Sequence, residues 1–193
     1  MPWQTNTETG RICAIAYGSE NATKPTAPNT GTSIDWTATA SGEAAEGWTL
    51  AMDNTTATVA RFSADDFSFN DAEGNEIVVK APTATQKDAI IQDQPQLLDN
   101  ITFTSYEAGA KIMDWATDWS SSSQVYTPGV HSTRRAIVIE VEGFGFHYMP
   151  SCEVHVGTHG GGSQGLAQSP VTIRVFRGSS VTTGYDWNQY ADS

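Results

Sequence analysis

The chain has 193 residues, of which 38% are hydrophobic and 17% are charged, and this length suits one sizeable domain with a core of its own. Its 22 acidic and 10 basic residues give a formal net charge of −12, so it lacks the cations that neutralise phosphates in ordinary nucleic-acid recognition. The first ten residues have neither the basic start nor the apolar stretch of a signal peptide, and no run approaches the roughly 20 apolar residues of a membrane helix. We therefore expect a soluble protein made in a cytoplasm, with no membrane partner.

The N-terminal half reads as strands and long loops, because it is rich in Thr, Ser, Asn and Gly. Residues 1–33 are predicted to form a strand, RICAIAY, and then an arm whose Pro, Asn and Gly residues build no core. Ile34, Trp36 and Ala38 alternate with polar residues, as in a half-buried strand. Three further strand patterns follow: WTLAMD, residues 56–71 and EIVVKA. Gly74-Asn75 predicts a hairpin turn between the last two.

Residues 105–119 carry the one helical pattern. Thr104 and Glu107 have the spacing of a capping box, and an apolar stripe at helical intervals follows: Ala108, Ile112, Trp115 and Trp119. We interpret the stripe as packing on a sheet. The region before it, residues 81–99, is expected to be an extended loop with at most one short helical turn, because Pro95 interrupts it.

The C-terminal half contains the longest strand patterns. Their inward residues are predicted to fill one core: Ile137, Ile139, Val141, Val154, Val156, Val171 and Ile173. Cys13 and Cys152 either pair or lie as buried thiols, and we favour the thiols. The fold class is therefore predicted as mainly β: a sandwich or partial barrel over residues 1–193 as one domain, with one packed α-helix near 105–119 and long loops. The tail, residues 179–193, has no assigned role beyond docking or disorder.

The stretch HVGTHGGGSQG, from His155 to Gly165, is the first place to look for chemistry. His155 and His159 have the spacing of a helical zinc motif, but the glycines make a helix implausible. A phosphate loop would need a lysine and a following helix, and both are missing. A calcium loop at DAEGNE lacks the twelfth-position Glu, and no nucleophile elbow occurs. We therefore predict no enzyme, no metal and no cofactor, and interpret the stretch as a flexible assembly loop: His155, His159, Gly160, Gly161 and Gly162.

The order of elements resembles the tail tube proteins (major tail proteins) of long-tailed bacteriophages. The resemblance covers roughly residues 34–178 and rests on DWTATASG, YEAGAKIMDWATDW, RRAIVIEVEG, FHYMPSCEVHVG and PVTIRVFRG. It implies a β-sandwich with a packed helix that stacks as hexameric rings into a hollow tube. Its partners would be itself and other tail proteins, and its location the virion, after synthesis in a bacterial cytoplasm. Family lumens are typically acidic, which lets DNA pass without specific binding.

Strand alternation assigns the candidate lumen acids, because their side chains lie opposite the predicted core face: Glu140, Glu142 and Glu153. Arg174 is predicted on the outward face of its strand, where it can pair with one of them. Residues 18–33 and 81–99 are the expected contacts between subunits. Two alternatives stay open: another phage structural protein, such as a capsid decoration or head–tail joining protein, and a carbohydrate-binding module that uses Trp36, Trp48 or Trp187 as a stacking platform.

Overall fold

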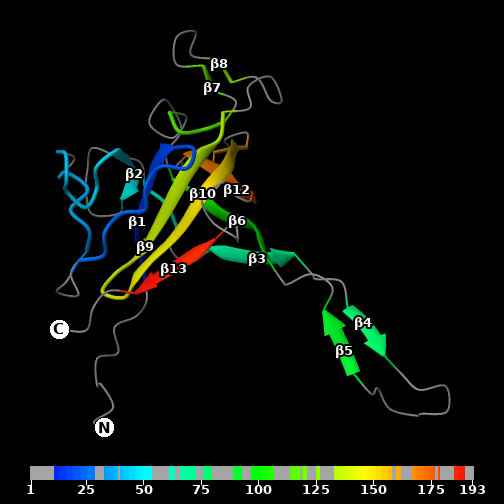
Figure 1. The fold of residues 1–193 in the computed structure, drawn as a ribbon. Helices are drawn as coiled ribbons and strands as arrows, with labels where there is room; N and C mark the ends of the chain where they lie inside the picture. Colours follow the sequence, from blue (N-terminus) through cyan, green and yellow to red (C-terminus); the bar gives the residue numbers. More distant parts are fainter. Residues whose placement is uncertain are drawn as a thin grey trace.

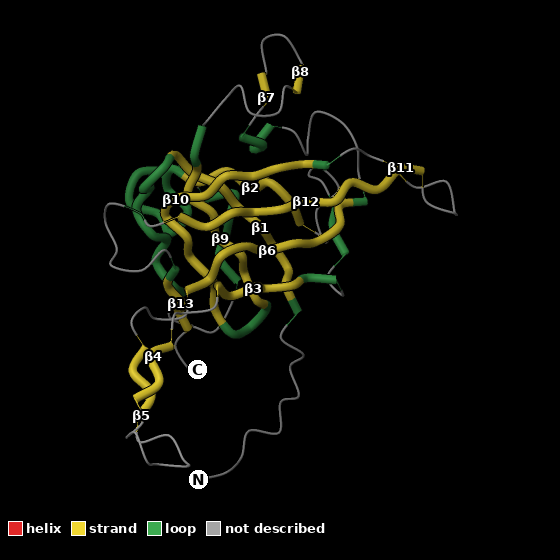
Figure 2. Tube along the Cα trace, turned by 90° about the vertical axis from the view of Figure 1, so that its right-hand side faces the viewer, coloured by secondary structure: helices red, strands yellow, loops and turns green. Residues whose placement is uncertain are grey.

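The structure of the chain is a computed structural model. It describes residues 11–28, 33–38, 40–53, 61–63, 66–72, 76–79, 89–92, 97–106, 114–117, 119–120, 125–126, 133–157, 160–161, 167–176, 178 and 185–189. These residues form strands, turns and loops, and none of them is helical (Figure 2). The prediction of a mainly β protein is therefore confirmed for the described part.

Nine strands form one antiparallel sheet, in which seven follow the order β2-β1-β9-β10-β12-β6-β3 while β11 pairs β12 and β13 pairs β10 (Figure 1). Their bounds are β1 Ile12–Ser19, β2 Trp48–Asp53, β3 Ser68–Ala72, β6 Leu97–Ser105, β9 Arg135–Val141, β10 Gly145–Val156, β11 Gly160–Gly161, β12 Ala167–Phe176 and β13 Asp186–Gln189. β10 is long enough to hold two partners on one side. Its first residues pair with β13 and its last residues pair with β12.

The remaining strands form two separate hairpins. β4 (Glu76–Val79) pairs with β5 (Ala89–Gln92), and β7 (Trp119–Ser120) pairs with β8 (Val125–Tyr126). The predicted hairpin around Gly74-Asn75 is therefore wrong: β3 pairs with β6 and β4 with β5, while positions 74 and 75 lie outside the described residues. Residues 89–92, expected in a loop, form β5 because the apolar run AIIQ completes a two-stranded ribbon with EIVV.

The sheet is buried on two faces. One cluster draws buried side chains from β1, β2, β6, β9, β10 and β12, and it contains six of the seven predicted core residues; Val141 packs against it partly buried. A second cluster covers the other face of β1, β9 and the start of β10, where Ala136, Val138 and Phe146 meet Ile34 and Trp36. Alternation alone predicted a polar outer face along β9, and this second cluster replaces it.

The predicted helix over residues 105–119 is not found in the described part. Ser105 ends β6, residues 114–117 form a turn, and Trp119 begins β7. Residues 107–113, which hold most of the expected helix, lie outside the described residues. Trp115 is fully buried in the first cluster, so its assignment to the core is confirmed even though its backbone is not helical.

Both cysteines are free thiols on opposite faces of the sheet. Cys152 is buried in the first cluster, and Cys13 packs partly buried against the second. The prediction of unpaired thiols is confirmed for both, and the prediction of burial is confirmed in full for Cys152 and in part for Cys13. Burial raises the pKa of Cys13 to about 12, with a further contribution from the charge of Glu140, and burial also raises the pKa of Cys152 strongly. Neither thiol therefore ionises near neutral pH.

Candidate functional site

Glu140, a predicted lumen acid, lies inside the protein. Its side chain is 1% exposed, and its carboxylate accepts hydrogen bonds from the backbone N–H of Ile34 and the indole Nε1–H of Trp36, both at 2.7 Å. The prediction that Glu140 faces solvent is therefore wrong. Residues 33–38 fold over the outer face of β9, and the carboxylate holds them there.

Glu142 and Glu153 remain at the surface. Glu142 is exposed just after β9, and Glu153 on β10 forms an ion pair with Arg134 at 3.3 Å. Arg174 is the register partner of Glu153 on β12, so the expected cross-strand placement is found, and Arg134 forms an ion pair with the same carboxylate.

A polar surface crosses four neighbouring strands of the sheet: β10, β12, β6 and β3. Register places directly opposing residues in two rows, whose side chains share one face because opposing residues in a sheet project to the same side. The rows are Glu153, Arg174, Asn100 and Asn70, and His155, Thr172, Thr102 and Ser68. We call these eight residues the polar face. All are exposed or partly exposed. A cavity of about 440 Å³ is lined by Asn100, Thr172 and Arg174 of this face together with Asp99, Val175 and Phe176.

The predicted assembly loop connects β10 to β12. His155 lies in β10 on the polar face, 3.7 Å from Glu153, while Gly160 and Gly161 form β11 and pair with Gln168 and Ala167. His159 and Gly162 lie outside the described residues. The structure therefore describes only one of the two histidines of the stretch. Gly160 and Gly161 extend the hairpin between β10 and β12.

Four aromatic rings meet on the opposite face, where β10, β13 and β3 come together. His147 on β10 lies at the centre: its ring centroid is 4.4 Å from that of Trp187, 4.9 Å from that of Phe69 and 5.5 Å from that of Tyr185. Its Nδ1 lies 2.7 Å from the Tyr185 hydroxyl. Burial lowers the pKa of His147 from its ordinary 6.5 to about 4, so the imidazole is neutral at pH 7. We call Phe69, His147, Tyr185 and Trp187 the aromatic patch.

The patch keeps two of its rings open to solvent. Phe69 is 38% exposed and Trp187 is 39% exposed, whereas Trp36 and Trp48 are buried and leave no stacking face. The tail, residues 179–193, has no role that can be assigned from the sequence alone. The pairing of residues 186–189 with β10 now places Tyr185 and Trp187 on the body of the protein, and Lys24 adds an ion pair with Asp186 at 2.8 Å.

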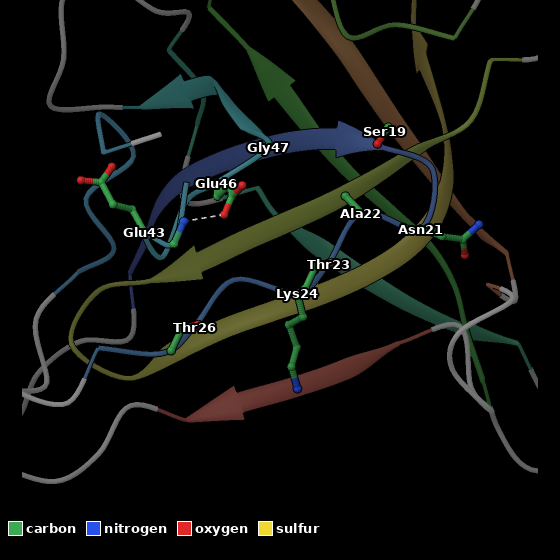
Figure 3. Close-up of a pocket in the computed structure, with 10 residues that line it drawn as sticks. Ser19, Asn21, Ala22, Thr23, Lys24, Thr26, Glu43, Glu46 and Gly47 are labelled. Atoms are coloured by element: carbon green, nitrogen blue, oxygen red, sulfur yellow. Dashed lines mark hydrogen bonds between the residues drawn. The ribbon is translucent and has the colours of Figure 1, made fainter. Parts of the chain in front are cut away.

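A cavity of about 550 Å³ lies between the residues that follow β1 and the turns before β2 (Figure 3). Its long side chains do not converge on it. Lys24 points toward β13, in agreement with its ion pair, and Glu46 accepts a hydrogen bond from the backbone N–H of Gly42. The carboxylates of Glu43 and Glu46 thus cap local backbone donors, and the arrangement offers no pair of groups for acid–base chemistry.

Comparison of the chain with models of known protein families and with curated proteins finds no match. Among the described residues, no group of three or more His, Cys, Asp or Glu side chains gathers as a metal site would require. In the same part of the chain, no helix has the length and apolar character needed to cross a membrane.

Proposed function

We propose that the protein is a self-assembling structural subunit, and specifically the tail tube subunit of a long-tailed bacteriophage. The observation that carries the proposal is the hairpin of β4 and β5. It pairs with no other described strand, and in both views it lies outside the main sheet (Figure 1, Figure 2).

Such a hairpin calls for a partner. A two-stranded ribbon alone in water is marginally stable. The register pairs of this ribbon join apolar residue types, with Ile77 opposite Ile91 and Val78 opposite Ile90. An apolar ribbon that lies outside the main sheet is stabilised when another subunit covers it. We therefore assign this hairpin to assembly.

The rest of the fold suits a tube wall. The first cluster contains side chains from six successive strands of the sheet: β2, β1, β9, β10, β12 and β6. A sheet that curves around one shared core in this way favours a sandwich or partial barrel. The polar face stays uncovered among the described residues, and in the proposed tube it lines the lumen, with Glu153 on β10 as its acid. Glu142 is exposed just after β9 and outside the polar face, and it remains a separate candidate for a lumen acid. Glu153 is balanced by Arg134 and Arg174, so the lining offers DNA neither a continuous basic track nor a strong local repulsion. The net charge of −12 opposes binding at longer range.

In this proposal the partners are further copies of the chain and the other proteins of the tail, and the protein ends in the virion after synthesis in a bacterial cytoplasm. No cofactor enters the function, and DNA passes through without specific contacts. A capsid decoration or head–tail joining protein would use the same apolar hairpin, and the shape of the assembly separates these possibilities from a tube.

Negative-stain electron microscopy of the purified full chain tests the proposal. Hollow rings that stack into tubes are the expected result. Ile91→Asp puts a charge on the hairpin and should leave monomers with an unchanged far-ultraviolet circular dichroism spectrum. Gln92→Asp, the matched control, adds the same charge to a neighbouring polar position and should still assemble. A wild-type chain that stays monomeric at high concentration contradicts the proposal.

A carbohydrate-binding module is the second candidate, because the exposed ring of Trp187 offers a stacking face beside Phe69. Titration with oligosaccharides separates the two functions. Two results together would favour the binding module. Oligosaccharide would quench the tryptophan fluorescence of the wild type but not that of Trp187→Ser, and the wild type would not assemble.

A further inference from the structure

The aromatic patch has the properties of a surface that another molecule covers. Two of its rings are more than a third exposed, and both contact the same central imidazole. The patch carries no charge at neutral pH, because His147 is uncharged there and the other three side chains are Phe, Tyr and Trp. It can therefore be taken out of water at little electrostatic cost.

Strand β13 adds an open edge beside the patch. Among the described strands β13 pairs with β10 alone, so its other edge forms no ladder with any described strand. Its sequence, DWNQ, contains neither the lysine nor the proline that commonly protects an edge strand. An open edge next to exposed aromatic rings suits the addition of another strand or ribbon.

The same chain contains an element that suits this surface and lies apart from it in Figure 1. The β4–β5 hairpin consists largely of apolar residues and leaves the body beyond the end of β3, away from β13 (Figure 1). Copies with a net charge of −12 repel each other, which favours contacts through surfaces of low charge. The strands of the hairpin carry one acid, Glu76, and β13 carries one, Asp186, which pairs with Lys24.

We propose that the aromatic patch and the open edge of β13 on one subunit receive the β4–β5 hairpin of a second copy of this chain. This inference rests on the proposed self-assembly and names its contact. Hairpin and patch are different surfaces, so the contact is heterologous. Each subunit gives its hairpin to one neighbour and accepts the hairpin of another, which generates a closed ring or an open filament.

Complementation between two defective variants tests the contact directly. The patch variant carries Phe69→Ser and Trp187→Ser, and the hairpin variant carries Ile77→Asp and Ile91→Asp at register partners. Each variant alone is expected to be monomeric in sedimentation velocity. An equimolar mixture is expected to form a one-to-one dimer and nothing larger, because only one intact hairpin and one intact patch remain in the pair.

Tyr106→Ser is the matched control, since Tyr106 is 38% exposed at the end of β6 and outside the patch. It should assemble like the wild type. If the double patch variant loses the native circular dichroism spectrum, Trp187→Ser alone serves instead, on a strand that contributes no buried core residue. It should raise the concentration needed for assembly by about tenfold or more.

The outcomes are distinguishable. Assembly of the folded patch variant at the wild-type concentration overturns the inference and leaves the proposed function standing. A mixture of the two variants that stays monomeric also overturns it. In that case the hairpin and the patch do not bind each other. A wild-type chain that fails to assemble overturns both.

Discussion

At the residue scale, the buried carboxylate of Glu140 shows how a charged side chain can specify a loop. The sheet residues around it are apolar on both faces, and Val138 on the same side of β9 is fully buried. The carboxylate of Glu140 accepts hydrogen bonds from Ile34 and Trp36, which are far away in sequence. A buried carboxylate is tolerated only where such donors satisfy it, so the contact fixes the position of residues 33–38 on the sheet.

Replacing Glu140 is therefore expected to cost stability. Glu140→Ala leaves the N–H of Ile34 and the indole N–H of Trp36 without an acceptor, and it should lower the free energy of unfolding by about 2–3 kcal/mol. Glu140→Gln keeps one acceptor oxygen and should cost roughly half as much. Urea denaturation measures both. Glu142→Gln, an exposed acid two positions along, is the control and should be close to neutral. Equal stability of Glu140→Ala and the control would contradict the role assigned to Glu140.

His147 makes the stability depend on pH in a defined direction. Burial lowers its pKa from 6.5 to about 4 in the folded protein, so the unfolded chain takes up the proton first as the pH falls. Its contribution to the free energy of unfolding is therefore complete above pH 6.5 and is lost progressively down to about pH 4. His147→Phe should flatten this part of the profile when denaturation is measured across that window. An imidazole NMR titration with a midpoint near 6.5 would contradict the assignment.

At the element scale, β13 depends on a glycine in the strand that it joins. Gly145 has φ +154°, and a Cβ at this position would lie 2.0 Å from the carbonyl oxygen of Asn188 in β13. This close approach lets the four residues of β13 pair along β10. The C-terminal strand is thus attached through a position that no other residue type can occupy without moving it.

Gly145→Ala should detach β13 and leave most of the sheet intact. The expected signs are faster amide exchange in residues 186–189 and greater acrylamide quenching of tryptophan fluorescence, since Trp187 loses its place against His147. Gly42→Ala is the matched control. It shares a positive φ, at +87°, but a Cβ there meets nothing within 4 Å, so it adds strain without a clash. Unchanged exchange in β13 of Gly145→Ala would show that the strand is held elsewhere.

The core face was predicted best in the strands whose apolar residues recur at every second position. Ile137, Ile139, Val154 and Ile173 were placed in the core correctly because their strands keep a strict period of two. The helix at 105–119 was predicted from a capping pattern and an apolar stripe that includes Trp115 and Trp119. Trp115 is indeed buried, but it reaches the core from a turn, and burial alone does not reveal which backbone carries it.

The candidate sites were harder to predict, because they depend on contacts between distant segments. Glu140 was predicted to be exposed, because the local pattern of residues does not indicate that residues 33–38 cover its strand. The aromatic patch joins residues from β3, β10 and the tail. The aromatic residues of the tail were a visible signal, but only the pairing of β13 with β10 gave them a location.

At the scale of the whole molecule, the charge sets a condition that any assembly of this chain has to meet. Every subunit carries a formal charge of −12, and packed copies bring these charges within a few tens of ångströms of each other. Within the described part of one subunit, Lys24 pairs with Asp186 and Arg134 pairs with Glu153. The proposed contact between hairpin and aromatic patch is apolar, so the repulsion is opposed by burial of apolar surface.

Salt should therefore promote assembly. Raising the ionic strength from about 0.01 M to about 0.1 M shortens the screening length from about 30 Å to about 10 Å, which weakens repulsion between subunits and leaves an apolar contact intact. Light scattering at fixed protein concentration should show the threshold for assembly falling as salt increases. An interface held by ion pairs would respond in the opposite sense, because screening would weaken it. A threshold that rises with salt would thus contradict the apolar contact, and the single substitution Ile91→Asp should leave the protein monomeric across the whole series.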